Sequence, residues 1–452
     1  EFLIIVAATI SLVMSASGLE TRSRRPSRAG RRNGPGTRMT APMRILMLIP
    51  QLGFGGAESA FLRLARNLAS EADVTLAVMD QPYSETLVPG AAWTDLPVLR
   101  LDDGLPVGGA WNGKVKRWWR MLSRLRSLKR HHDVTISFMS GMNLLNALTG
   151  PRARTIVSER GSKRHDIGMT PRGRLIWTRL LDPLIYWRSG RVVAASKGLA
   201  HEIVTANPWT ASRVLAIEGT VEAEALVDAA DLPVELELQP LMDCETVVTF
   251  GRLHVQKGYD VLLSAFSRVR AERPKARLLL IGVGPEEARL RVLAADLGLR
   301  VDTAGAEADV VLPGLRPDPL RYLQVGRVFV LPSRFEGLPN ALIEALASGV
   351  DVLASDCPWG PRSILSAGGL SYDGPAPDLP LALTHGVLMP LPDTTNAAEV
   401  WADEIARALA KPLLPRPSRA DRLAAIARYD IARTGPRWLD LARSMTEKAA
   451  PR

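Results

Sequence analysis

The sequence predicts an α/β protein built from two doubly wound domains that face each other across a cleft. Apolar strand-like runs, glycine-rich turns and helical segments alternate along residues 44–195. The same alternation restarts near residue 246 and continues to residue 355. An acidic, proline-containing stretch, residues 232–243, lies between the two series, and we interpret it as the linker. Such alternation is typical of parallel sheets that are covered by helices on both faces.

The first series opens with the apolar run of residues 44–50, which is typical of a buried strand. A glycine-rich turn follows at residues 51–56. A helix is expected over residues 57–69, because its apolar side chains fall on one face. Further strands are expected at residues 74–79, 134–138, 155–158 and 192–195.

The second series has expected strands at residues 246–250, 277–281, 328–331 and 352–355. In open sheets of this kind, ligands bind beyond the carboxyl ends of the strands. Residues 418–445 are expected to be helical, with an interruption at Gly435 and Pro436. We expect the domains at residues 39–235 and 244–412, with residues 413–452 packing back toward the first domain.

The composition is that of a globular protein with a basic balance. The chain has 452 residues and a net charge of +10, of which residues 1–38 supply +5 through seven Arg and two Glu. A basic protein suits an anionic substrate or a membrane surface. No zinc-finger, RNP-type or basic-zipper pattern is present, so nucleic acid is not an expected partner. Two cysteines in no metal-ligand spacing indicate free thiols in a reducing compartment.

Residues 1–38 are set apart from the rest. Residues 2–18 are almost continuously apolar but shorter than the roughly 20 residues that a membrane span needs. The basic tract follows the apolar run, which is the reverse of the order in a signal peptide. The segment is either a membrane anchor or a region upstream of a start at Met39 or Met43. We favour the second interpretation and expect a disordered or non-native extension.

Two glutamates stand in a loop and helix after the strand at 328–331. Glu336 lies in the loop, and Glu344 lies inside a helix that ends at Gly349. The helical distance between them is about 12 Å, comparable to the span from ribose to sugar in a nucleotide-sugar. Their carboxylates could bind hydroxyl groups at both ends, and the helix amino terminus could bind a diphosphate. Taken alone, two glutamates at this spacing often occur by chance.

Two cations follow the strand at 246–250. Arg252 and Lys257 lie at the ligand end of the sheet, where they could neutralise a departing diphosphate. A solvated basic loop is the alternative. The chain has no P-loop, no His-Glu-x-x-His, no Gly-x-Ser-x-Gly and no Asp-x-Asp. We expect no metal site, and the missing Asp-x-Asp argues against a single-domain, metal-dependent plan.

Taken together and in this order, these blocks resemble glycosyltransferase family 4, whose members are retaining enzymes of GT-B fold with two facing Rossmann-like domains. The resemblance spans about residues 44–445 and is most specific over residues 250–260 and 328–365. Residues 158–160 and 356–365 look closest to bacterial enzymes that extend lipid-linked oligosaccharides or make cell-surface polysaccharides.

The resemblance implies a role for each block. Arg252 and Lys257 match the cations that hold the donor diphosphate, Glu336 matches the glutamate on the transferred sugar, and Glu344 matches the one on the ribose. The other implied contacts are Gly55 and Gly56 at the diphosphate, Leu338 and Asn340 at the donor, Leu315 near the base, and Glu159 and Arg160 on the acceptor side. Many relatives carry a His in place of residues 158–160, so no acceptor-side base is assigned.

The implied reaction transfers sugar with retention from a UDP- or GDP-sugar to a glycan or a polyprenyl-diphosphate-linked acceptor. The nucleotide-sugar is a co-substrate, and no cofactor or metal is implied. The implied location is cytoplasmic, on the inner face of the membrane. The alternatives are a nucleotide-sugar epimerase or hydrolase of the same fold and a catalytically silent partner.

Residues 114–130 are rich in Lys and Arg and contain no acidic residue. Their apolar residues recur near helical spacing. Arg117, Arg120 and Arg124 are candidates for contact with an anionic membrane or with the acceptor diphosphate. The alternative is an ordinary helix that packs on the sheet through its apolar stripe.

Overall fold

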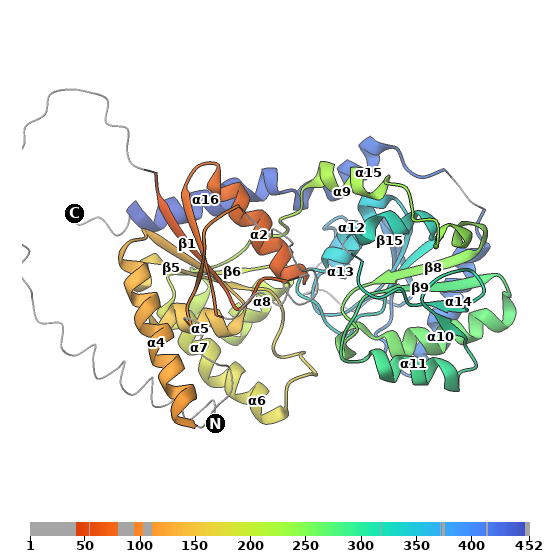
Figure 1. Ribbon diagram of the computed structural model, residues 1–452, viewed down its shortest axis with the longest axis horizontal. Coiled ribbons are helices and arrows are strands. Elements are labelled where there is room, and N and C mark those ends of the chain that lie inside the picture. Colours follow the sequence, from red (N-terminus) through yellow and green to blue (C-terminus); the bar gives the residue numbers. More distant parts are fainter. Residues whose placement is uncertain are drawn as a thin grey trace, which may run out of the picture.

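The computed structural model describes residues 42–53, 55–79, 95–102, 111–316, 318–370, 372, 376–412 and 415–447. The expectations for residues 1–38 lie outside the described residues. The described chain forms two α/β lobes side by side, each with helices on both faces of a sheet (Figure 1). The predicted fold class is therefore confirmed.

The N-terminal lobe holds a seven-stranded sheet in the order β3-β2-β1-β4-β5-β6-β7. All its strand pairs are parallel. The order reverses between β1 and β4, where the loops after the two strands diverge. Its strands are β1 (Arg44–Ile49), β2 (Asp73–Val78), β3 (Val98–Arg100), β4 (Val134–Phe138), β5 (Thr155–Glu159), β6 (Arg191–Ala194) and β7 (Val214–Ala216).

Helices cover both faces of this sheet, which is why β1, β4 and β5 are buried along almost their whole length. They are α2 (Gly56–Ala69), α4 (Trp111–Arg130), α5 (Ser140–Leu148), α6 (Pro171–Ile176), α7 (Asp182–Arg188) and α8 (Lys197–Ala206), with short turns η1 (Arg152–Arg154), η2 (Trp177–Leu181) and η3 (Pro208–Thr210).

The C-terminal lobe holds an eight-stranded sheet in the order β10-β11-β9-β8-β12-β13-β15-β14. Only the β14–β15 pair is antiparallel among the described pairs. Its order reverses between β8 and β12. Its strands are β8 (Glu245–Phe250), β9 (Ala276–Ile281), β10 (Val301–Asp302), β11 (Val310–Val311), β12 (Val328–Leu331), β13 (Asp351–Ser355), β14 (Leu381–Leu383) and β15 (Gly386–Met389).

The helices of this lobe lie between its strands in the chain. They are η4 (Gln239–Asp243), η5 (Val255–Lys257), α10 (Tyr259–Glu272), α11 (Glu287–Asp296), η6 (Pro319–Val325), α12 (Asn340–Ser348), α13 (Pro361–Leu365) and α14 (Ala397–Ala410). No described helix is both long and apolar enough to cross a membrane.

The chain crosses between the lobes twice. After β7 it reaches α9 (Ala223–Ala230), which contacts α12 and so lies in the C-terminal lobe ahead of the acidic stretch at 232–243. It returns through α15 (Arg419–Ile426) and η7 (Ala427–Tyr429) to α16 (Ile431–Glu447), which packs on α2. The crossings lie side by side, because the Val221 N–H donates to the Tyr429 carbonyl and the Ile431 N–H to the Val221 carbonyl, at 3.1 and 2.7 Å.

The expected interruption at Gly435 and Pro436 is wrong. Helix α16 runs through both residues, and the break lies earlier, at residues 427–430. Trp438 is fully buried against Phe138, with ring centroids 5.9 Å apart, and Gly435 packs so closely on Asn67 that a side chain would not fit. This packing holds the helix together although Pro436 lacks an N–H donor.

Candidate active site

Sheet topology brings the two most specific sequence blocks together. β8 and β12 are neighbours at the switch point of the C-terminal sheet. Arg252 and Lys257 follow β8, Glu336 follows β12, and Glu344 lies in α12. Residues about 80 positions apart in the chain therefore meet at one edge of the sheet.

Lys257 and Glu336 form a buried ion pair. The Lys257 Nζ lies 2.7 Å from the Glu336 Oε1, and the Ser333 hydroxyl donates to the same oxygen at 2.7 Å. Burial alone would lower the pKa of Lys257, but the Glu336 carboxylate outweighs it and holds that pKa above its usual value. The pair is thus charged and fixed, with the Glu336 side chain only 8 % exposed.

The Glu336 loop is also tied down through its backbone. The Glu336 N–H donates to the Pro358 carbonyl at 2.5 Å, and the Trp359 N–H donates to the Glu336 carbonyl at 3.0 Å. The loop after β12 and the loop after β13 therefore move as one unit. This fixes the position of the Glu336 carboxylate without help from a ligand.

Glu344 is partly buried on α12 and faces the other lobe. Burial raises its pKa, while Arg63 of α2 and Lys257 act in the opposite direction. Arg63 donates from Nε to the Thr220 carbonyl at 2.6 Å, but its buried Nη2 has no hydrogen-bond partner among the described residues. No sequence pattern selected Arg63, because its position opposite Glu344 depends on how the two lobes pack together.

Glu58 lies opposite Arg252. Burial raises the pKa of Glu58, and a backbone hydrogen bond and Arg252 partly oppose that shift. A Cβ at Gly55 would collide with the Glu58 carboxylate, so this glycine lets the side chain fold back over the start of α2. No sequence pattern selected Glu58, and the structure adds it to the site.

The two lobes touch directly at this edge. The Asn340 side chain donates from Nδ2 to the Gly56 carbonyl at 2.9 Å. Gly337 lies against the Arg160 backbone with no room for a Cβ, and Leu338 beside it is buried. The structure thus brings together the expected donor residues Gly56, Leu338 and Asn340 at one interface.

Arg160 and Leu315 occupy separate sides of the site. The Arg160 guanidinium lies 5.1 Å from the Phe138 ring centroid, and burial together with Arg63 lowers its pKa to about 10. Its buried Nη1 has no hydrogen-bond partner in the described part of the chain. Leu315 is partly buried and follows Gly314, whose carbonyl accepts a 3.0 Å hydrogen bond from the Gly282 N–H.

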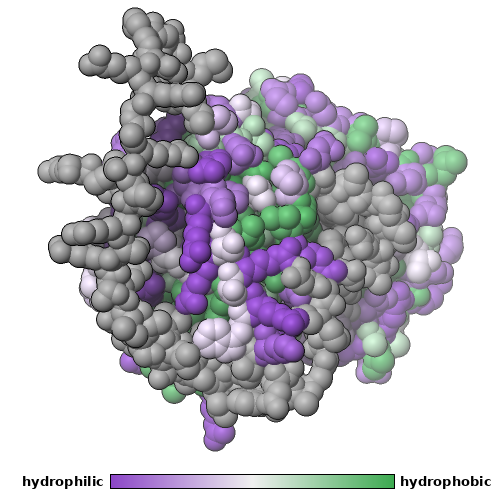
Figure 2. All heavy atoms as spheres, turned by 60° about the vertical axis from the view of Figure 1, so that its left-hand side comes forward, coloured by the Kyte–Doolittle hydropathy of each residue, from purple (hydrophilic) through white to green (hydrophobic). Residues whose placement is uncertain are grey.

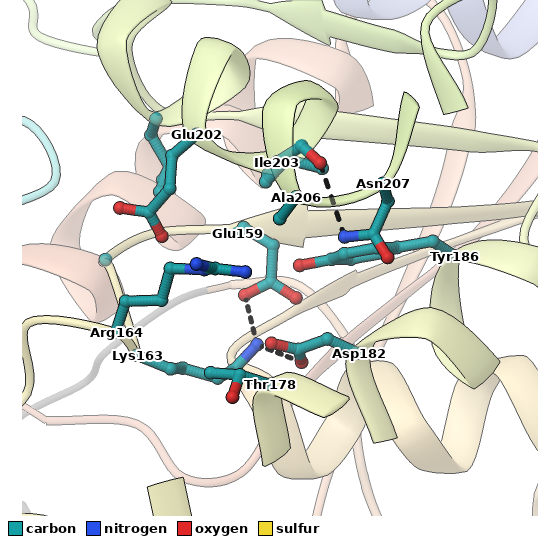
Figure 3. A pocket seen from close by; sticks show the side chains of 12 residues that line it. Glu159, Lys163, Arg164, Thr178, Asp182, Tyr186, Glu202, Ile203, Ala206 and Asn207 are labelled. Atoms are coloured by element: carbon teal, nitrogen blue, oxygen red, sulfur yellow. Dashed lines mark hydrogen bonds and ion pairs between the residues drawn. The ribbon is translucent and has the colours of Figure 1, made fainter. Parts of the chain in front are cut away.

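Glu159 is engaged inside the N-terminal lobe. Its carboxylate accepts hydrogen bonds from Lys163 at 2.9 Å and from Asn143 at 3.1 Å. Lys163 also contacts Asp182 at 2.6 Å, and burial raises the pKa of Asp182 to about 6 against the effect of Lys163. Glu159, Lys163 and Asp182 line a small polar pocket at the carboxyl end of β5, with the Tyr186 ring beside Glu159 (Figure 3).

A second polar contact joins the lobes. The Trp359 Nε1 donates to the Glu202 carboxylate of α8 at 2.8 Å. Ser162 donates to the same carboxylate at 2.7 Å, and the His165 Nδ1 lies 3.3 Å from it. No sequence pattern marked Glu202 or His165 for this interdomain contact.

Helix α4 packs against the core of the N-terminal lobe through its apolar residues. Met121, Leu122 and Leu125 are fully buried. Arg117 contacts Asp102 at 3.1 Å and its side chain is 15 % exposed. Arg120 is exposed and Arg124 is partly exposed. The view toward the N-terminal lobe shows hydrophilic side chains around a smaller apolar patch (Figure 2). Of the three candidate arginines, Arg120 has the most exposed side chain.

The described residues contain no group of three or more His, Cys, Asp or Glu placed to hold a metal ion. The charged groups of the site are instead Arg63, Arg160, Arg252 and Lys257, with Glu58, Glu336 and Glu344. Cations near a helix amino terminus can bind an anionic ligand, and the carboxylates can accept hydrogen bonds from hydroxyl groups.

Known proteins share this fold. Anabaena HepE, solved with UDP and glucose, superposes with a TM-score of 0.64 at 16 % identity, covering 89 % of this chain and 100 % of that one. The two facing lobes therefore define a protein of GT-B fold. Residues 244–410 match the family model for glycosyl transferases group 1.

Two curated relatives extend the match. An uncharacterized glycosyltransferase of Methanocaldococcus jannaschii is 33 % identical over 150 residues, which are 33 % of this chain and 35 % of that one. A GDP-mannose-dependent phosphatidylinositol monomannoside mannosyltransferase of Mycolicibacterium smegmatis is 28 % identical over 61 % of this chain and 72 % of its own length. The chain spans about a third of the length of the first curated relatives that it matches.

Proposed function

We propose that this chain is a retaining glycosyltransferase that moves a sugar from a UDP- or GDP-sugar to a glycan or a lipid-linked acceptor. The observation that carries the proposal is the Lys257–Glu336 ion pair at the switch point, beside Arg252 and the start of α12. The match to the family model supports the reaction class.

The proposed donor lies along α12. Its diphosphate would contact Arg252, Lys257 and the amino terminus of α12, because all three present positive charge or free N–H groups. Glu336 would bind the transferred sugar and Glu344 the ribose, while Leu315 would lie near the base. Gly55 and Gly56 would face the diphosphate from the other lobe.

The proposed reaction breaks the bond between the sugar C1 and the diphosphate oxygen and forms a C1–oxygen bond to the acceptor on the same face. A donor phosphate oxygen takes the proton of the acceptor hydroxyl. Arg252 and Lys257 stabilise the negative charge that develops on the leaving diphosphate. The Lys257 side chain is mostly buried, which strengthens its share of this effect, because charges interact more strongly at low dielectric.

The donor proposal is tested by thermal-shift titration with UDP, GDP and their sugars, followed by transfer assays with the best donor. We expect one nucleotide series to raise the melting temperature and Glu336→Gln to abolish transfer. Arg268→Gln, an exposed position on α10, serves as the control. Absence of stabilisation by every nucleotide would contradict the proposal. Free sugar released without any acceptor would favour the hydrolase alternative.

We further propose that the acceptor is lipid-linked and that α4 holds the protein at an anionic membrane surface. The mycolicibacterial relative acts on a phosphatidylinositol mannoside, and a Campylobacter jejuni relative on an undecaprenol diphosphate-linked sugar. Lys116 and Arg120 are exposed on α4, and basic side chains near an anionic surface each contribute about 1 kcal/mol.

Vesicle flotation tests the membrane proposal. Lys116→Glu with Arg120→Glu should abolish binding to phosphatidylglycerol vesicles. The matched control is Arg289→Glu with Arg291→Glu on α11, which makes the same charge change on the other lobe. Equal binding by the α4 variant and the control would refute the membrane role of α4.

A further inference from the structure

A second hollow lies where the two crossings meet, apart from the loops after β8 and β12. Its volume is about 430 Å³. Three parts of the chain line it: Lys197 and Glu218 from the N-terminal lobe, Gly368 after α13 in the C-terminal lobe, and Arg428, Arg433 and Arg437 from the returning segment.

The hollow carries an excess of positive charge. Glu218 accepts hydrogen bonds from the Arg428 Nη2 at 2.8 Å and from the Lys197 backbone N–H at 3.1 Å. Arg437 donates to the Ala216 carbonyl at 2.8 Å. Within the described residues, the side chains of Lys197, Arg433 and Arg437 have no carboxylate partner. One carboxylate thus faces four cations.

Such a site suits a small anion with more than one charge. Guanidinium groups form paired hydrogen bonds with phosphoryl oxygens, and a concave surface of one sign concentrates counter-charge. A volume of about 430 Å³ has room for a phosphorylated compound of sugar size. A flat lipid surface could not reach the bottom of a hollow between lobes.

We propose that this hollow binds a small phosphorylated anion at a place separate from the donor site, and that its occupation holds the lobes in the arrangement seen here. The hollow exists only while Lys197, Gly368 and Arg428 are close, because they belong to different parts of the molecule. Gly219 packs on the Tyr429 backbone with no room for a Cβ, so the crossings that border the hollow move together. A ligand that binds only when the lobes are arranged in this way shifts their equilibrium toward this arrangement.

Calorimetric titration of the full chain with inorganic pyrophosphate, with the donor site saturated by UDP, tests the inference. We expect one remaining pyrophosphate site. Lys197→Gln with Arg433→Gln should weaken it at least about tenfold, since both lost cations face the hollow. The control pair Arg268→Gln and Lys275→Gln, on the C-terminal lobe surface, should leave it unchanged.

Three results would overturn the inference. UDP could abolish pyrophosphate binding, which would assign that binding to the donor site. The hollow variant could bind as the wild type does, or the control pair could weaken binding equally. UDP affinity, measured in the same samples, tests the donor site separately, so failure of the proposed function and failure of this inference are distinguishable. If the anion stabilises this arrangement, UDP and pyrophosphate must alter each other's affinity by one common factor.

Discussion

At the scale of single residues, the cations after β8 lie in different surroundings. Lys257 is fixed in its ion pair with Glu336, whereas Arg252 is exposed and has no hydrogen bond or ion pair among the described residues. In the proposed mechanism, Arg252 is therefore able to follow the charge that develops on the leaving diphosphate. Lys257 instead interacts with two carboxylates. Besides pairing with Glu336, it partly opposes the rise that burial causes in the pKa of Glu344.

Arg252→Ala should lower kcat by about 10²- to 10³-fold, the usual loss when one group that stabilises a developing charge is removed. Its melting temperature should stay that of the wild type, because the side chain holds no other part of the fold. Steady-state kinetics and differential scanning calorimetry check both points. Turnover close to normal would refute the assigned role, and Arg252→Lys should retain part of the activity.

Glu344→Gln should raise stability and lower affinity for the nucleotide. Burial raises the pKa of Glu344 above 4.5, so the native state keeps this proton where the unfolded chain has lost it. Stability therefore falls as pH rises from about 4.5 through the native pKa, and the substitution removes this loss. We expect a higher melting temperature at pH 7 and UDP binding about tenfold weaker.

The same substitution separates a binding role from a structural one. At pH 4 the wild-type carboxyl is protonated, so the stability difference between Glu344→Gln and the wild type should shrink there. Melting curves between pH 4 and pH 7 measure this difference. A variant that is less stable than the wild type at pH 7 would show that Glu344 supports the fold instead of the ligand.

At the scale of elements, α8 and the loop after β13 close the site on the acceptor side. Trp359 donates to Glu202, and a Cβ at Gly198 would collide with the Trp359 ring. The Trp359 backbone also holds the Glu336 carbonyl. One residue thus links the contact between the lobes to the position of the Glu336 loop.

Trp359→Phe should weaken UDP binding about fivefold to tenfold without a large change in kcat at saturation. The ring still packs, but the loss of a hydrogen bond to a charged group disfavours the closed arrangement by roughly 1 to 1.5 kcal/mol. Titration calorimetry and kinetics with saturating donor measure the two effects. A change confined to kcat would contradict this account, and Tyr372→Phe, which leaves the Glu202 contact intact, is the control.

At the scale of the whole molecule, α16 belongs to the core of the N-terminal lobe, although it follows the C-terminal lobe in the chain. Trp438, Leu439, Ala442 and Met445 are buried in the same cluster as β1 and α2 residues. The two lobes are therefore joined by two crossings and by shared packing.

Trp438→Ala should lower the free energy of unfolding of the N-terminal lobe by about 3 to 5 kcal/mol, the usual cost of such a cavity. Trp438→Phe is the matched control. It keeps most of the packing and removes an indole N–H that has no hydrogen-bond partner among the described residues. Urea denaturation followed by circular dichroism compares the two. Equal losses in both variants would show that the cavity is not the cause.

The strands at 134–138 and 328–331 were predictable to the residue, because both are short runs rich in β-branched and apolar residues. The two-residue strands β10 and β11 were not, because so short a run carries no periodicity. The prediction of a break at Pro436 was wrong, because the burial of Trp438 stabilises the helix more than the low helix propensity of proline destabilises it.

The sequence by itself predicted the fold class and the resemblance to family 4, and it selected Arg252, Lys257, Glu336 and Glu344 as candidates, because each follows a recognisable strand within one lobe. Only the tertiary structure decided what faces them. Glu58, Arg63, Glu202 and the cationic hollow at the crossings depend on contacts between segments more than 100 residues apart. Those contacts follow from how two separately packed lobes meet, and local pattern in a sequence carries no signal for that meeting.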